Sequence, residues 1–162
     1  MTKATNHPPG KGILLVEDDP KDVLLTLQAF QEVQLKSQVA VVSDGAEALD
    51  YLFGAGDYAA DAPELPRVVL LDLHLPKLNG LEVLDRIRTD PRTRHLPVVA
   101  FTSSLAERDM RASYLGGANS CVRKPEEFAD FAETLRQIWH YWSSINEVPP
   151  LLEARAARAA MA

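Results

Sequence analysis

The sequence predicts an α/β fold in which helices cover both faces of a parallel sheet. Short runs of roughly four aliphatic residues alternate with longer segments whose apolar residues recur at helical spacing. Such runs are typical of strands that are buried on both sides, because helical crossovers cover both faces of a parallel sheet. With 162 residues, the chain has the length of one domain with a proper core.

Five of the apolar runs are expected to form strands, and a helical pattern follows each of them. The predicted strands cover residues 13–16, 39–42, 68–73, 97–102 and 119–123. Parallel neighbours need helical connections, and these crossovers are right-handed. The pattern therefore predicts a doubly wound five-stranded sheet with five helices. The flavodoxin-like order 2-1-3-4-5 fits best, and it places the carboxyl ends of strands one and three side by side.

Capping residues mark the first two helices. Asp19 followed by Pro20 predicts the start of the first helix, since aspartate is a good N-cap and proline is favoured at the first helical position. The second helix is expected to begin after Asp44 and to end at Gly54. The buried stripe of the first helix is expected to consist of Val23, Leu24, Leu27, Phe30 and Val33.

The other three helices carry similar signals. The third is expected to end before Pro91. Ser104 and Glu107 have the spacing of a capping box for the fourth helix, and Gly116-Gly117 closes it. The last helix follows Pro125 and is the longest amphipathic element.

Composition excludes several functional classes. The net charge of -6 and the pI near 5.2 argue against a nucleic-acid-binding surface, which needs clustered Lys and Arg. A single cysteine, Cys121, excludes an intramolecular disulfide, and the polar N-terminus lacks the apolar core of a signal peptide. No apolar stretch approaches the roughly 20 residues that span a bilayer. We therefore expect a soluble, cytoplasmic protein.

Polar side chains close four of the apolar runs. Glu17 and Asp18 follow the apolar run of the first predicted strand, and Asp72 follows the apolar run 68–71 of the third. Thr102 ends the fourth, and Lys124 follows the fifth. Ligands bind at the carboxyl edge of such sheets, so these groups are expected to form one site.

This set of side chains suits a divalent cation and a phosphoryl group. Carboxylates packed together repel, and one would take a proton unless a cation is present. Oxygen ligands favour Mg²⁺ or Mn²⁺. Asp72, alone at its strand end, is the candidate nucleophile toward phosphorus, which would give an acyl phosphate. Lys124 and Thr102 supply donors for the phosphoryl oxygens.

Four stretches carry a family resemblance. They are Leu14–Pro20, Leu71–Pro76 with Asn79-Gly80, Phe101–Ser104 and Arg123–Pro125. Together they resemble the receiver domain of bacterial two-component response regulators, over roughly residues 12–143. The resemblance implies a CheY-like fold and a signalling module rather than an enzyme. It divides the chain into a flexible N-terminus (1–11), a receiver domain (12–145) and a C-terminal extension (146–162).

The resemblance also implies a role for each site residue. Asp72 would accept a phosphoryl group from a histidine kinase. Asp18 would bind Mg²⁺ directly, Glu17 mostly through water, and the backbone carbonyl of His74 would be a further ligand. Thr102 and Lys124 would bind the phosphoryl oxygens, and the Lys124–Pro125 bond would be cis.

Two features depart from or narrow the family pattern. Receivers usually carry Tyr or Phe three residues before the lysine, where this chain has Cys121, so the usual aromatic switch is in doubt. The pattern of Trp139, Trp142, Asn146 and Pro149-Pro150 resembles small regulators encoded beside bacterial and cyanobacterial phytochromes, which are light-sensing histidine kinases. This implies a bacteriophytochrome partner and a homodimer through the fourth helix, the fifth strand, the fifth helix and the extension. The two tryptophans suit either the core or that dimer interface.

Other functions fit less well. A phosphatase of the haloacid dehalogenase type would need a second aspartate two residues after Asp72, where the chain has His74. A flavodoxin would need a Ser/Thr/Gly-rich phosphate loop after the first strand. An unphosphorylated scaffold with the same fold remains an alternative, although the complete set of acidic, Thr and Lys positions argues against it.

Overall fold

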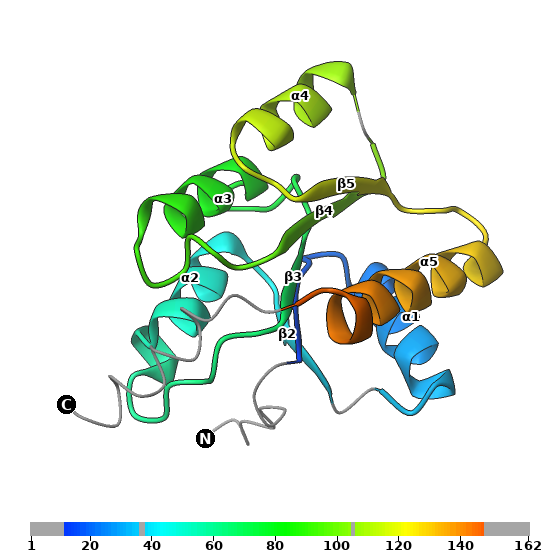
Figure 1. The fold of residues 1–162 in the computed structure, drawn as a ribbon, viewed down its shortest axis with the longest axis horizontal. Helices are drawn as coiled ribbons and strands as arrows, with labels where there is room; N and C mark the ends of the chain where they lie inside the picture. Colours follow the sequence, from blue (N-terminus) through cyan, green and yellow to red (C-terminus); the bar gives the residue numbers. More distant parts are fainter. Residues whose placement is uncertain (1–11, 36–37, 105, 148–162) are drawn as a thin grey trace.

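The computed structural model describes residues 12–35, 38–104 and 106–147, and it contains one parallel sheet in the order β2-β1-β3-β4-β5 (Figure 1). The strands are β1 (Ile13–Val16), β2 (Val39–Val42), β3 (Val68–Leu71), β4 (Val98–Thr102) and β5 (Ser120–Arg123). The predicted strand order is therefore confirmed. β3 ends two residues earlier than predicted, so Asp72 lies just beyond the strand.

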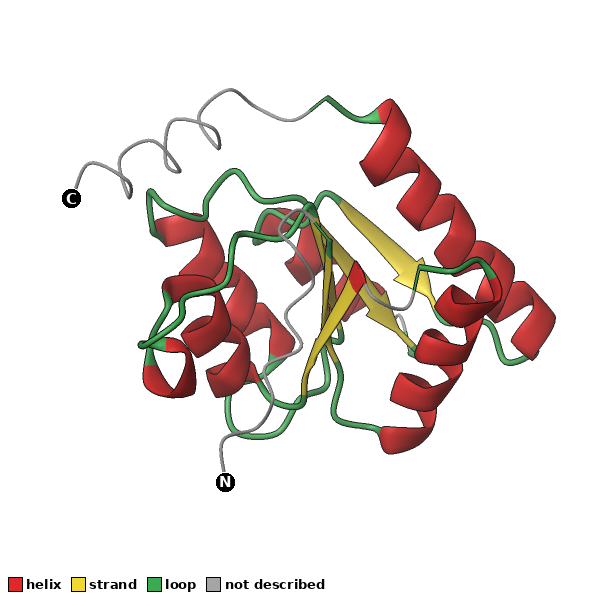
Figure 2. Cartoon of the chain, turned by 90° about the horizontal axis from the view of Figure 1, so that it is seen from below, coloured by secondary structure: helices red, strands yellow, loops and turns green. Residues whose placement is uncertain are grey.

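Helices cover both faces of this sheet, as predicted (Figure 2). They are α1 (Pro20–Glu32), α2 (Gly45–Phe53), α3 (Gly80–Thr89), α4 (Glu107–Leu115) and α5 (Phe128–His140). A short 3-10 turn, η2 (Gly56–Tyr58), follows α2, and a π-helical turn, η3 (Tyr141–Ile145), continues α5. α1 and α5 lie side by side on one face, and α2 and α3 lie on the other, with α4 beside α3 and β5.

Side chains of the central strands alternate between two apolar cores. Leu14 and Val16 pack with α2 and α3, whereas Ile13 and Leu15 pack with α1 and α5. Every residue of β1 and β3 is buried. Burial of one such side chain contributes about 1.5–3 kcal/mol, so these two strands form a rigid base for the residues that follow them.

Most of the predicted helix boundaries are confirmed. The Asp19 side chain caps α1 by accepting a hydrogen bond from the Lys21 N–H at 2.9 Å. Asp44 caps α2 in the same way, and Gly54 ends α2 in the left-handed conformation with φ 64°. This conformation favours glycine because the residue has no Cβ.

The predicted buried stripe of α1 is wrong at one position. Leu24 is 68% exposed, whereas Thr26 and Ala29 are buried together with Phe30. The helix is therefore rotated so that the 26, 29, 30 positions face the sheet. Small side chains at two of these positions let α1 approach the sheet closely, and Leu24 points outward.

Two expectations near the site are also wrong. Ser104 does not cap α4: the N-cap residue is Ala106, which makes no side-chain cap, and Glu107 instead pairs with Arg111 at 3.2 Å. Ala106 has an extended conformation, so the helix starts too late for a Ser104 cap. The Lys124–Pro125 bond is trans, the more stable isomer of an X-Pro bond unless contacts select the cis form.

Some expectations concern residues that the structure does not describe. The N-terminal segment that was predicted to be flexible (1–11) and most of the C-terminal extension, including Pro149-Pro150, lie outside the described residues. Among the described helices, none combines the length and the apolar character needed to cross a bilayer.

Candidate functional site

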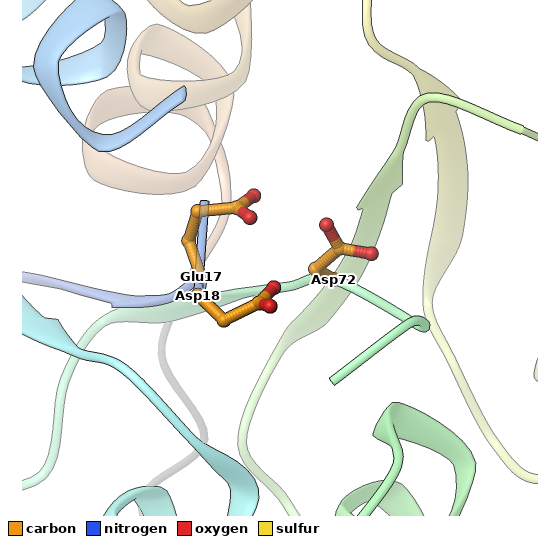
Figure 3. A group of neighbouring side chains, drawn as sticks. All are labelled: Glu17, Asp18 and Asp72. Atoms are coloured by element: carbon orange, nitrogen blue, oxygen red, sulfur yellow. The ribbon is translucent and has the colours of Figure 1, made fainter. Parts of the chain in front are cut away.

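Three carboxylates meet at the carboxyl edge of the sheet, as predicted. Glu17, Asp18 and Asp72 point toward one another (Figure 3), and one oxygen of each lies within 4.8 Å of the other two. Glu17 and Asp72 are buried, and Asp18 is exposed. The parallel pairing of Val16 with Leu71 brings these residues together, because each strand then ends at the same level.

Gly80 lets helix α3 begin directly against this edge. A Cβ atom on Gly80 would lie 2.3 Å from the Asp72 carbonyl oxygen and 2.6 Å from the Leu73 Cα, closer than any side chain tolerates. The Gly80 N–H instead donates to the Leu73 carbonyl at 2.9 Å. The backbone that carries Asp72 is therefore held between β1 and the start of α3.

Lys124 lies at the centre of the acidic group. Its Nζ donates to Asp72 Oδ2 at 2.9 Å, to Asp22 Oδ2 at 2.9 Å and to Glu17 Oε2. An ammonium has three N–H donors, so each donor has a carboxylate partner. The Lys124 side chain is only 5% exposed, so these contacts are shielded from water and are stronger than surface ion pairs.

Burial and crowding shift two pKa values in this site. Burial is the main cause that raises the pKa of Glu17 to about 7, and the negative charge of Asp72 adds to it, although the Lys124 ammonium acts in the opposite direction. Burial alone would lower the pKa of Lys124, but hydrogen bonds to Asp22, Glu17 and Asp72 raise it above its usual value. Lys124 therefore stays protonated at neutral pH, whereas Glu17 binds a proton below a pH of about 7.

The second oxygen of Asp72 is held by two donors. Asp72 Oδ1 accepts hydrogen bonds from the His74 N–H at 2.9 Å and from the Thr102 hydroxyl at 3.3 Å. Thr102 is fully buried, so its hydroxyl has a fixed position beside the carboxylate. The predicted grouping of Thr102 and Lys124 with Asp72 is therefore what the structure shows. The His74 side chain is largely exposed, 3.8 Å from the Asp109 carboxylate on α4.

Sequence reasoning missed Asp22. This residue lies in the first turn of α1, where an acidic side chain is commonly explained by the helix dipole. In the structure, the Asp22 side chain accepts a hydrogen bond from Lys124, which is 102 positions away in the sequence. The only signal available was an additional aspartate a few residues after the acidic pair.

The donor set fits a hard divalent cation. All the ligand atoms of Glu17, Asp18 and Asp72 are carboxylate oxygens, which suit Mg²⁺ and Mn²⁺ better than softer metals. Glu17, Asp22 and Asp72 all contact the single ammonium of Lys124, so one positive charge faces several carboxylates. A cation of charge +2 would remove this imbalance.

Cys121 replaces an aromatic residue on β5, where it pairs in register with Ala100. Its side chain is half-buried and packs against the core on the α2 and α3 side of the sheet. Burial raises the pKa of the thiol, although hydrogen bonding to Ser113 and Tyr114 of α4 lowers it. The half-buried side chain thus connects β5 with α4.

Comparison with known proteins gives a consistent result. The model of the response regulator receiver domain matches residues 13–136. The chain is 39% identical over 137 residues to the probable methanogenesis regulatory protein FilR2 of Methanothrix harundinacea, covering 85% of this chain and 86% of FilR2. It is 33% identical over 149 residues to the response regulator Rcp1 of Synechocystis sp., covering 92% and 99%.

Solved structures agree with the sequence comparison. The phosphorylated cyanobacterial phytochrome response regulator RcpA superposes with a TM-score of 0.79 at 35% identity, covering 86% of this chain and 99% of RcpA. The Mn²⁺-bound form of Rcp1 superposes with a TM-score of 0.77 at 32% sequence identity, covering 86% of this chain and 99% of Rcp1. The bacteriophytochrome response regulator RtBRR superposes with a TM-score of 0.69 at 45% sequence identity, covering 94% of each chain.

Proposed function

The chain belongs to the response regulator receiver domain family, and from this premise we propose that Asp72 accepts the phosphoryl group and that a phytochrome-type histidine kinase donates it. One observation carries the first part. The Asp72 carboxylate lies at the end of β3 with the acidic pair on one side and the Lys124 and Thr102 donors on the other. The second part is supported by the similarity to RcpA and RtBRR, which are phytochrome response regulators.

In the proposed reaction, an Asp72 oxygen forms a bond to the phosphorus of a phosphohistidine. The P–N bond breaks, and its electron pair goes to the imidazole nitrogen of the donor. The product is a mixed anhydride on Asp72, which water later cleaves to inorganic phosphate. Lys124 and Thr102 would donate hydrogen bonds to the phosphoryl oxygens, since most of the catalysis in phosphoryl transfer is positioning and charge neutralisation.

We assign the metal to Mg²⁺, with Mn²⁺ as the alternative. Glu17, Asp18 and Asp72 would hold it, with the backbone carbonyl of His74 as a further ligand. Bound there, the cation would neutralise the charge of the carboxylates and of the incoming phosphoryl group. The Mn²⁺-bound structure of Rcp1 supports a divalent metal in a similar protein.

The test of this function is intact mass after incubation with acetyl phosphate. We expect a gain of one phosphoryl group in the presence of Mg²⁺ and no gain with excess EDTA. The same assay with a bacteriophytochrome kinase and ATP would then test the donor. Absence of labelling by either donor, under conditions that label another receiver, would contradict the proposed function.

Metal affinity is expected to depend on pH. Burial raises the pKa of Glu17 to about 7, so below this pH Glu17 holds a proton that a cation must displace. The Mg²⁺ affinity should therefore rise about tenfold between pH 6 and pH 8, with proton release at the lower pH. Calorimetry in buffers of different ionisation enthalpy measures both quantities. Glu17→Gln should flatten the profile, and a flat profile in the wild type would contradict the shift.

We further propose a cytoplasmic homodimer that uses the region of α4, β5 and α5, with the C-terminal extension. Met110, Tyr114 and Leu115 of α4 are exposed apolar residues, and so are Tyr141 and Ile145 in η3. Trp139 and Trp142 are partly buried against the core on the α1 and α5 side, so they serve core packing first. Exposed apolar side chains of this kind suit an interaction surface.

Charge introduced into this surface is expected to separate the dimer. Leu115 on α4 is 82% exposed, and Leu115→Glu would place a carboxylate in the apolar interface, which should weaken the dimer by tenfold or more. Leu24→Glu is the matched control, because Leu24 is an exposed leucine of α1 outside the proposed interface. Sedimentation equilibrium measures the association. Equal dissociation by both variants would contradict the proposed interface.

A further inference from the structure

Asp22 has a contact that the proposed roles of the other site residues do not explain. Its Oδ2 accepts a hydrogen bond from Lys124 Nζ at 2.9 Å, and its side chain is 18% exposed. An acidic residue that served only the N-terminus of α1 could point into solvent. Instead, the side chain connects the first turn of α1 with the residue that follows β5.

The three carboxylate partners of Lys124 differ in their other tasks. Glu17 and Asp72 belong to the group whose oxygens could hold a metal, and Asp22 does not belong to it. Asp72 would also carry the phosphoryl group, so its carboxylate would become a mixed anhydride and would accept a hydrogen bond from Lys124 less strongly. Glu17 would contact the bound metal cation as well as Lys124. Asp22 alone has no second proposed task, so it would keep Lys124 as its partner throughout.

We propose that Asp22 is a positioning residue for phosphoryl transfer, which anchors the Lys124 ammonium to α1 while Glu17 and Asp72 change partners. This inference rests on the proposed function of Asp72. The donor that Lys124 now directs to Asp72 Oδ2 becomes available to a phosphoryl oxygen, and the contact with Asp22 keeps Nζ in place for it. A displacement of about 1 Å at a reacting centre can cost up to a hundredfold in rate.

The rate of acyl-phosphate formation tests this role. Full-length wild type, Asp22→Ala and Asp22→Asn are incubated with acetyl phosphate at a series of Mg²⁺ concentrations, and intact mass gives the labelled fraction over time. Asp22→Ala should lower the rate at saturating Mg²⁺ about tenfold. The half-saturating Mg²⁺ concentration should change by less than about threefold, since Asp22 is not in the metal group. Asp22→Asn keeps an acceptor oxygen and should react within about threefold of the wild type.

Glu32→Ala is the matched control, because it removes an exposed carboxylate from the same helix, at the end distant from Lys124. It should leave both quantities unchanged. The inference is overturned if Asp22→Ala reacts at the wild-type rate or faster. It is also overturned if Asp22→Asn loses about tenfold in rate, because the negative charge of Asp22 would then matter and not its hydrogen bond to Lys124. Should Asp22→Ala not fold, Asp22→Leu takes its place, because leucine also removes both acceptor oxygens, and the same loss of about tenfold is expected.

The outcomes also separate this inference from the function on which it rests. If the wild type is labelled at Asp72 and Asp22→Ala reacts normally, only the positioning role fails. If the wild type is not labelled by any donor, both proposals fail. Both proposals are supported if Asp22→Ala loses about tenfold in rate, Asp22→Asn restores the rate, and the Mg²⁺ dependence is unchanged. A purely structural role of Asp22 would lower the melting temperature without these three results.

Discussion

Asp72→Asn is expected to abolish the metal-dependent gain of a phosphoryl group. The carboxylate oxygen is the nucleophile, and an amide cannot form the mixed anhydride. The fold should persist, because asparagine retains an oxygen for the His74 N–H and the Thr102 hydroxyl. Stability at neutral pH should be equal or greater, since the Asp72 charge is one of the causes that raise the pKa of Glu17.

Intact mass after treatment with acetyl phosphate and Mg²⁺ measures this loss. Asp57→Asn is the control, because Asp57 is an exposed aspartate in η2, and it should be labelled like the wild type. Asp18→Asn should still be labelled, but only at a higher Mg²⁺ concentration, since Asp18 is a candidate ligand and not the acceptor. Labelling of Asp72→Asn to the wild-type extent would mean that another residue is the acceptor.

Lys124→Met is expected to reduce both stability and phosphorylation strongly. Removing one partner of a buried ion pair leaves uncompensated charge, which typically costs about 3–5 kcal/mol in the free energy of unfolding. Here the ammonium has three carboxylate partners, so its loss leaves Glu17, Asp22 and Asp72 in mutual repulsion. Phosphorylation should fall by about a hundredfold or more, because a donor to the phosphoryl oxygens is lost.

Urea unfolding with and without Mg²⁺ measures the stability effect. The loss should be larger at pH 8 than at pH 6, because Lys124 is one of the groups that lower the pKa of Glu17, and without it the ionised form of Glu17 at pH 8 has no cation beside it. Mg²⁺ should restore part of the stability. Lys77→Met is the matched control: Lys77 pairs with Asp44 at the same 2.9 Å, but its side chain is 69% exposed, so little change is expected. Similar losses in both variants would contradict the importance of burial.

The fold and most of the site could be predicted from the sequence because local signals and long-range contacts agree there. Glu17 and Asp72 each follow a run that is buried on both faces, and the parallel order fixes where two such strands end. The place of Thr102 and Lys124 follows from the same alternation of strands and helices. These predictions needed only the strand order and the position of each residue along its strand.

What could not be predicted depends on how each helix is rotated and where its first turn begins. Leu24 has the spacing of a buried residue, yet packing of α1 against the sheet buries Thr26 and Ala29 instead. Asp22 faces Lys124 because of the same rotation. α4 likewise starts only at Glu107, after an extended Ala106. Periodicity and capping patterns in a single sequence do not contain this information.

Cys121 makes the chain suitable for spectroscopy without any substitution. It is the single cysteine of the sequence, and it lies on β5 with its thiol against Ser113 and Tyr114 of α4. A small fluorinated thiol reagent attached there would report by ¹⁹F NMR on the contact between β5 and α4. Because burial raises the pKa of the thiol, labelling should be most efficient at alkaline pH. The residue that stands where receivers usually carry an aromatic side chain thus offers a direct probe of the contact between β5 and α4 during phosphorylation.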